Sequence, residues 1–164
     1  MVSREVLQNV EVFKGLDDDE LSAIQGCCKE KQFQLGDRLF AEGDYATHLW
    51  IVIEGQVDLR FELPAGRPTT AEHTVTSVVA KPSVGKCLGW SCFVPPHKMR
   101  LSAYCATRSC KVVMVEKEDL VKLFEKDTKL GYLVMSYMTT VVGHRFHQFQ
   151  DEIAKYMGEH LMGY

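Results

Sequence analysis

The residues best placed to bind a small molecule lie between positions 85 and 103, in the stretch GKCLGWSCFVPPHKMRLSA. Two glycines, a short turn and two prolines precede Lys98 and Arg100, which stand just before a predicted strand. Either basic side chain supplies a positive charge for a phosphate. Trp90 presents an indole face to a planar or cationic ligand or, alternatively, fills the space itself. The stretch is therefore predicted to be a binding loop.

The cysteines are the second group with reactive side chains. None of them forms the C-x-x-C spacing that is typical of zinc ribbons or thioredoxin-like sites. In a reducing compartment, such residues are interpreted as small apolar members of the core. A redox or iron–sulfur role is the alternative, favoured only by the adjacent pair at positions 27 and 28. The six are Cys27, Cys28, Cys87, Cys92, Cys105 and Cys110.

The histidines are candidate ligands for a metal ion or for haem. His48 and Glu54 partly match a cupin metal motif. A cupin needs a His-x-His pair, however, and His48 is the single histidine in its strand. A haem sensor would use His97, or His144 and His147, which are spaced i, i+3 on a predicted helix. A solvated polar helix face is the simpler interpretation of His144 and His147. Because the cupin motif is incomplete as well, catalysis is not expected.

Composition favours one globular domain. The chain has 164 residues, of which 46% are hydrophobic and 25% charged, and its net charge is −3. This charge argues against direct binding to nucleic acid. The charged N-terminus is unlike a signal peptide, and no apolar run reaches the roughly 20 residues that span a bilayer. The protein is expected to be cytoplasmic.

Helices are predicted before the β-structure. Apolar spacing indicates a short helix over residues 2–12, and Asp17 or Asp18 is a candidate cap for a second helix. From Phe33 onward the period changes to two, which indicates strands.

Short strands with glycine and proline turns make up the middle of the chain. Residues 48–63 are predicted to form a hairpin around Glu54-Gly55, followed by a turn at 64–68 and strands in 70–80, 102–107 and 110–116. Glycines 36, 43 and 55 stand in turn dipeptides where a positive φ is expected. This pattern predicts an α+β fold with a β-roll, a double-stranded jelly roll of about eight antiparallel strands.

A short helix over 117–127 and a long helix from about residue 130 to 160 are predicted to end the chain. Val142, Phe146, Phe149, Ile153 and Tyr156 follow one another at alternating steps of four and three. This apolar seam predicts a parallel coiled-coil homodimer. The alternative is that the seam packs on its own β-roll, because only about two heptads are regular and Gly143 interrupts them. Residues 1–127 would form the roll and 128–164 the dimerisation helix of the same domain.

The order of elements, together with LGDRLFAEGDYATHLWIVIEGQVDL at 35–59, resembles the cyclic-nucleotide-binding domain of the catabolite-activator and fumarate-nitrate-regulator (Crp/Fnr) superfamily. The resemblance covers the chain but includes no helix-turn-helix domain. It implies a regulatory, ligand-sensing protein, with a small effector as ligand and a partner protein as output. In that family the segment 85–103 is the phosphate-binding cassette, where helix N–H groups bind the cyclic phosphate.

The cassette departs from the family pattern at two positions. Gly89-Trp90 replaces the family's Gly-Glu, whose glutamate holds the ribose, and Leu101 stands where the family has a phosphate-binding arginine, with Arg100 displaced by one residue. Losing both contacts weakens cAMP or cGMP binding by a factor of hundreds. The resemblance therefore implies an effector site without identifying the effector, a cyclic nucleotide or another small molecule. The implied site residues are Gly89, Trp90, Ser91, Cys92, Arg100, Leu101, Ser102, Phe149 and Gln150, with Phe146 also on the helix.

Overall fold

The computed structural model describes residues 2–60, 76–77 and 84–161. Three short helical segments come first: α1 (Arg4–Gln8), the 3-10 helix η1 (Glu11–Phe13) and α2 (Asp18–Gly26). The single helix predicted over residues 2–12 is thus divided into α1 and η1. Asp17 caps α2, because its Oδ1 accepts the N–H of Glu20 at 2.9 Å while Glu20 Oε2 accepts the N–H of Asp17 at 2.8 Å. The predicted cap is confirmed.

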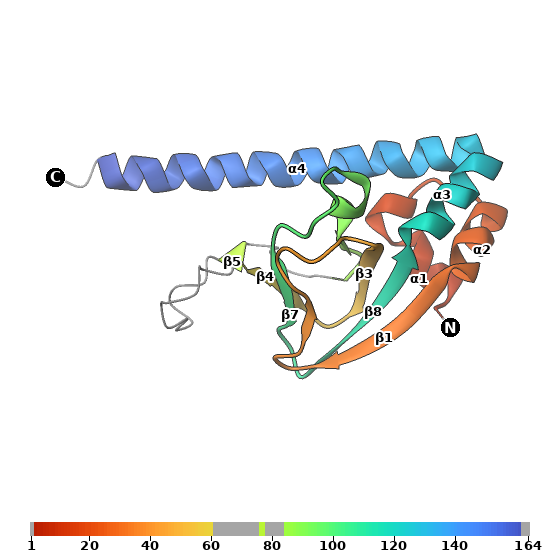
Figure 1. Cartoon of the computed structure of the whole chain (residues 1–164), viewed down its shortest axis with the longest axis horizontal. Helices are drawn as coiled ribbons and strands as arrows, with labels where there is room; N and C mark the ends of the chain where they lie inside the picture. Colours follow the sequence, from red (N-terminus) through yellow and green to blue (C-terminus); the bar gives the residue numbers. More distant parts are fainter. Residues whose placement is uncertain (1, 61–75, 78–83, 162–164) are drawn as a thin grey trace.

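In the part of the chain that the structure describes, eight strands form two antiparallel sheets that face each other as a β-roll, which confirms the predicted fold class (Figure 1). The first sheet has the order β1-β8-β3-β6 and the second has the order β2-β7-β4-β5. The strands are β1 (Cys28–Gln34), β2 (Arg38–Phe40), β3 (His48–Glu54), β4 (Val57–Arg60), β5 (Thr76–Ser77), β6 (Cys87–Leu88), β7 (Ser102–Cys105) and β8 (Ser109–Glu116). Most of the predicted turn and strand in 64–80 lies outside the described residues.

The predicted hairpin at 48–63 is wrong. β3 pairs with β6 and β8, whereas β4 pairs with β5 and β7, so the turn after Glu54 carries the chain from one sheet to the other. Gly55 makes this crossing possible: its φ is 78°, and an added Cβ would lie 2.4 Å from the carbonyl oxygen of Ser109. A local glycine turn has the same sequence signature in a hairpin and in a sheet crossing, and the tertiary pairing decides between them.

The core lies between the two sheets and extends to the helices at one end. Aromatic side chains gather in it, with the ring of Trp50 5.5 Å from Phe40 and 6.4 Å from Phe33. Leu49, Ile51 and Val52 of β3 are fully buried because this strand is central in its sheet.

Two helices complete the fold, α3 (Lys117–Lys126) and α4 (Thr128–Leu161). α4 has 34 residues and runs without a break through Gly143, extending well beyond the roll (Figure 1). Its inner face carries Leu130, Val134, Met138 and Val141, which are buried against the rest of the chain. No described helix is long and apolar enough to cross a membrane.

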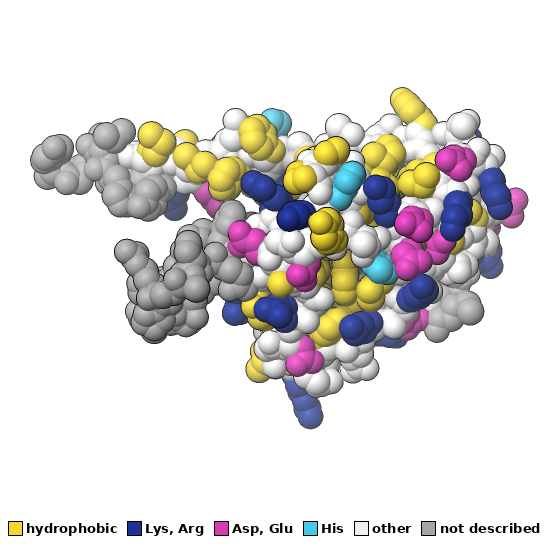
Figure 2. Space-filling model, in the orientation of Figure 1, with side chains coloured by type: hydrophobic (Ala, Val, Ile, Leu, Met, Phe, Trp, Pro, Cys, Tyr) yellow, Lys and Arg dark blue, Asp and Glu magenta, His cyan; other side chains and the backbone are white. Residues whose placement is uncertain are grey.

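The outer part of α4 exposes apolar side chains, visible as a run of hydrophobic atoms along the projecting helix (Figure 2). Phe146 is 57% exposed, Phe149 48% and Ile153 41%. Buried residues on another side of α4 fill most of its contact with the roll, while Val142 of the predicted seam is partly buried against the core.

Candidate functional site

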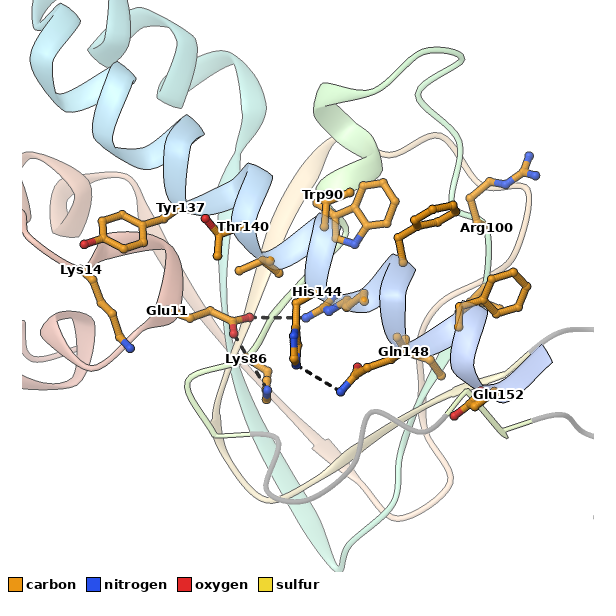
Figure 3. Close-up of a pocket in the computed structure, with 17 residues that line it drawn as sticks. Glu11, Lys14, Lys86, Trp90, Arg100, Tyr137, Thr140, His144, Gln148 and Glu152 are labelled. Atoms are coloured by element: carbon orange, nitrogen blue, oxygen red, sulfur yellow. Dashed lines mark hydrogen bonds and ion pairs between the residues drawn. The ribbon is translucent and has the colours of Figure 1, made fainter. Parts of the chain in front are cut away.

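A cavity of about 770 Å³ lies between α4 and the β-roll (Figure 3). This size is typical of sites for small organic ligands. Its walls come from four parts of the chain: η1 and the segment after it, the roll near β4 and β6, the cassette, and the inner and outer faces of α4. Its lining residues include Glu11, Lys86, Trp90, Arg145, Phe146 and Phe149.

Gly89 lies within the predicted cassette, immediately before its short helix. β6 ends one residue before it, and the 3-10 helix η3 (Trp90–Phe93) follows directly. Its φ is 72°, and an added Cβ would lie 2.8 Å from both the carbonyl oxygen of His48 and Cδ1 of Trp50. Only glycine fits this turn, so it fixes the direction in which Trp90 leaves the sheet.

A second, much smaller pocket lies beside the cassette. Its volume is about 50 Å³, which is room for one or two water molecules at roughly 30 Å³ each. Trp90, Arg100 and Leu101 border both this space and the large cavity. Trp90 is half-buried, so its side chain forms part of the wall of both spaces.

The cation positions of the cassette are placed differently from one another. Arg100 is exposed, and in Figure 3 its guanidinium points outward, away from Trp90. Leu101 is half-buried. Lys98 borders neither cavity and instead lies over the ring of Tyr45, with Nζ 5.4 Å from the ring centroid.

Three other predicted site residues contribute to the frame of the cassette. Ser91 is buried and borders the small cavity. Cys92 and Ser102 are buried and border neither cavity. Ser102 Oγ accepts the backbone N–H of Glu42 at 2.8 Å, which ties β7 to the turn after β2.

Of the two residues predicted on the long helix, Phe149 borders the large cavity, together with Phe146. Gln150 is exposed and is not among the lining residues. The difference follows from helix geometry, because adjacent residues are rotated by about 100° and residue 150 faces away from the roll.

Arg145 connects α4 to β6, the strand that leads into the cassette. The sequence pattern did not identify this arginine as a site residue. Arg145 Nη2 donates to the carbonyl oxygen of Cys87 and lies 3.4 Å from Oε1 of Glu11. The same Glu11 oxygen accepts the N–H of Cys87 at 2.9 Å. Both polar groups of the Cys87 backbone are therefore held, one by η1 and one by α4, two residues before Gly89.

Positive charge is in excess near this contact. Lys86 Nζ lies 4.0 Å from Oε2 of Glu11, and Lys14 borders the cavity as well. The Glu11 carboxylate thus contacts two cationic side chains, those of Lys86 and Arg145, and the side chain of Lys14 lines the same cavity. Figure 3 shows Glu11, Lys14 and Lys86 toward one end of the cavity and Trp90 and Arg100 toward the other.

The signal for Arg145 was present in the sequence. It follows Val134, Met138 and Val141 at helical spacing, so it lies on the face that the roll covers. A cation on a buried helix face needs a partner. Glu11 is 134 residues away in sequence, and no local pattern identifies it as that partner.

The cysteines and histidines are the predicted candidates for a metal, haem or redox role. The described residues contain no group of three or more histidine, cysteine or acidic side chains arranged to hold a metal ion. Burial raises the pKa of Cys28 and Cys92 to about 12 and that of Cys87 further still. His144 borders the large cavity with Nε2 3.3 Å from Nε2 of Gln148, and His97 borders neither cavity.

Comparison with known proteins identifies the family. The model of the cyclic nucleotide-binding domain matches residues 30–127. No curated protein matches the sequence significantly. A structure described as a candidate cyclic nucleotide-binding protein from Geobacter metallireducens is 28% identical, with a TM-score of 0.70, and the match covers 90% of this chain and 100% of that one.

Two further structures share the fold at lower identity. A cyclic nucleotide-binding domain from Methylobacillus flagellatus has a TM-score of 0.75 at 18% identity, over 93% of this chain and 80% of that one. The catabolite activator protein of Thermus thermophilus has a TM-score of 0.70 at 19% identity, over 91% of this chain and 64% of that one. Nearly all of the β-roll, with its glycine-led cassette, lies within the residues that the family model matches, and the chain therefore belongs to the cyclic nucleotide-binding domain family.

Proposed function

We propose that this domain is a non-catalytic regulatory module that binds a small effector in the large cavity and responds by moving α4. The observation that carries the proposal is that the cavity is walled by both parts: Trp90 and Leu101 belong to the roll side, and Arg145 and Phe149 belong to α4. A ligand in contact with both has different affinities for different positions of the helix, and that difference shifts the equilibrium between them.

We infer that cyclic nucleotides are weak ligands of the roll interior. Trp90 and Leu101 stand at the family's ribose-binding and phosphate-binding positions, and the pocket beside them is only about 50 Å³ in volume, well below the roughly 300 Å³ of a typical small-molecule site. This loss of contacts and space supports an effector that binds outside the roll, under α4.

The exposed seam of α4 supports a homodimer. Positions 132, 135, 139, 142, 146, 149 and 153 follow steps of three and four, and most are exposed in the single chain. In the parallel coiled coil that we propose, effector binding changes how the two helices meet, and a partner protein reads that change. Ile153→Lys should convert the dimer to a monomer in sedimentation velocity, and His147→Lys, at an exposed position off the seam, should not. A monomer before mutation would contradict the dimer.

The ligand-binding part is tested by thermal unfolding with cAMP, cGMP, cyclic di-GMP, haem and a panel of organic acids. A ligand at 100 times its Kd adds about 2.7 kcal/mol, which raises Tm by roughly 5–10 °C for a chain of this size. We expect a shift that Phe149→Glu abolishes. A shift that this variant leaves intact would move the site elsewhere, and no shift with any member of the panel would contradict the effector-binding role.

A further inference from the structure

The two ends of the large cavity differ in chemistry. Figure 3 shows Glu11, Lys14 and Lys86 toward one end and the indole of Trp90 toward the other. Phe146 and Phe149, from the part of α4 between the labelled His144 and Glu152, add two aromatic rings to the lining. A ligand that fills the cavity therefore meets charge at one end and apolar surface at the other. Either end alone would be unremarkable on a protein surface, but here they line one continuous space of about 770 Å³.

The charged end has unused positive charge. Glu11 accepts the N–H of Cys87 and the guanidinium of Arg145, so its carboxylate is already occupied by the frame of the protein. Lys86 is at the limit of an ion pair with it, at 4.0 Å. Among the described residues, no carboxylate lies within ion-pair distance of Lys14. The two lysines are thus available to an anion.

The aromatic end is open to a ligand. Trp90 is half-buried, and Phe146 and Phe149 are about half exposed from α4. Rings that line a partly covered space offer a planar or flexible hydrocarbon the apolar contacts it loses in water. The same end holds Arg100 and Glu152, which are of opposite sign and give no net preference for charge there.

We propose that the effector is an amphipathic organic acid, whose apolar body packs against Trp90, Phe146 and Phe149 and whose carboxylate pairs with Lys14 and Lys86. This inference rests on the proposed function, because it names the class of ligand for the same cavity. The acid bridges the roll, through Lys86 and Trp90, to α4, through Phe146 and Phe149. Its length and charge together therefore set the position of the helix.

The test is isothermal titration calorimetry of the full chain with matched acid and amide pairs: 4-phenylbutyrate against 4-phenylbutyramide, and 1-naphthylacetate against 1-naphthylacetamide. Each pair has the same apolar body and differs in the charged head. We expect the acids to bind at least tenfold more tightly than the amides. In the double variant Lys14→Met, Lys86→Met this preference should disappear while amide binding is unchanged, and Lys155→Met, an exposed lysine of α4, should leave the preference intact.

The inference is overturned if each amide binds within twofold of its acid, or if the double-lysine variant keeps the preference. Its failure can be separated from failure of the proposed function by including cAMP, cGMP, cyclic di-GMP and haem. If one of these binds and the acids do not, the inference is wrong and the effector-binding role stands. If nothing binds, both are wrong.

Discussion

Replacing Arg145 by methionine should weaken the attachment of α4 to the roll. The guanidinium donates to the Cys87 carbonyl, lies 3.4 Å from Glu11 and is 20% exposed. A hydrogen bond to a charged group contributes about 1.5–3 kcal/mol to stability. Because the Arg145 guanidinium is partly exposed and Lys86 still neutralises Glu11 in the variant, we expect a loss of unfolding free energy near the lower end of this range, at about 2 kcal/mol. A loss of that size lowers Tm by about 4–8 °C in a chain of this length.

A double-mutant cycle separates the ion pair from simple loss of packing. Glu11→Gln keeps an acceptor for the Cys87 N–H at 2.9 Å but removes the charge that Arg145 contacts. Urea unfolding of Arg145→Met, Glu11→Gln and the double variant should give a coupling energy of about 1 kcal/mol. Lys155→Met, which removes an exposed cation from the same helix, should change the unfolding free energy by less than about 0.5 kcal/mol.

The reasoning would be refuted if the two single losses added to within about 0.3 kcal/mol, because independent sites behave in that way. It would also fail if Arg145→Met were as stable as the Lys155 control. Either result would mean that the apolar inner face, from Leu130 to Val141, holds α4 without help from the ion pair.

Three further outcomes are expected. Asp17→Ala should cost about 1 kcal/mol in urea unfolding, whereas Asp17→Asn should retain the cap. The hydrogen bond from the Glu20 N–H lowers the pKa of Asp17 below 3.8, so the stabilisation by the Asp17 carboxylate is present above pH 3.8 and is lost as the pH falls through the lowered pKa. Asp17→Asn should remove this contribution to the pH dependence of the unfolding free energy, measured between pH 5 and 3. Burial raises the pKa of Cys92 and Cys110 from 9.0 to about 12. The unfolding free energy should therefore be unaffected by titration of these thiols below pH 9 and should fall between pH 9 and 12. Neither thiol should react with Ellman's reagent in the folded protein at pH 8. Gly89→Ala should lower stability by at least about 1–2 kcal/mol in the same assay, because φ is 72° and the added Cβ meets a carbonyl oxygen at 2.8 Å; wild-type stability would show that this turn is free to relax.

Local features of the fold could be predicted from the sequence because short-range physics determines them. The Asp17 cap and the positive φ of Gly36, Gly43 and Gly55 depend on residues within one turn of each other. Gly143 did not interrupt the helix, because one glycine costs only about 1 kcal/mol relative to alanine and the helix is long.

Pairings between distant residues could not be predicted in this way. The partners of β3 were assigned to the wrong sheet because a glycine turn does not specify which strands it joins. Trp90 and Phe149 were found through the family pattern, whereas Glu11 and Arg145 were missed because their contact joins opposite ends of the chain. The charged half of the candidate site became visible only when α4 was placed over η1.

Because α4 is long, a small tilt near the roll produces a larger displacement at its far end. The roll holds it as far as Arg145, and the 16 residues from there to Leu161 extend for about 24 Å at 1.5 Å per residue. A tilt of only about 5° at that point would therefore move the far end by roughly 2 Å, several times the displacement at the cavity itself. If the proposed effector tilts the helix, a partner protein can accordingly detect the change at the tip of α4, at a distance from the cavity and without touching the roll.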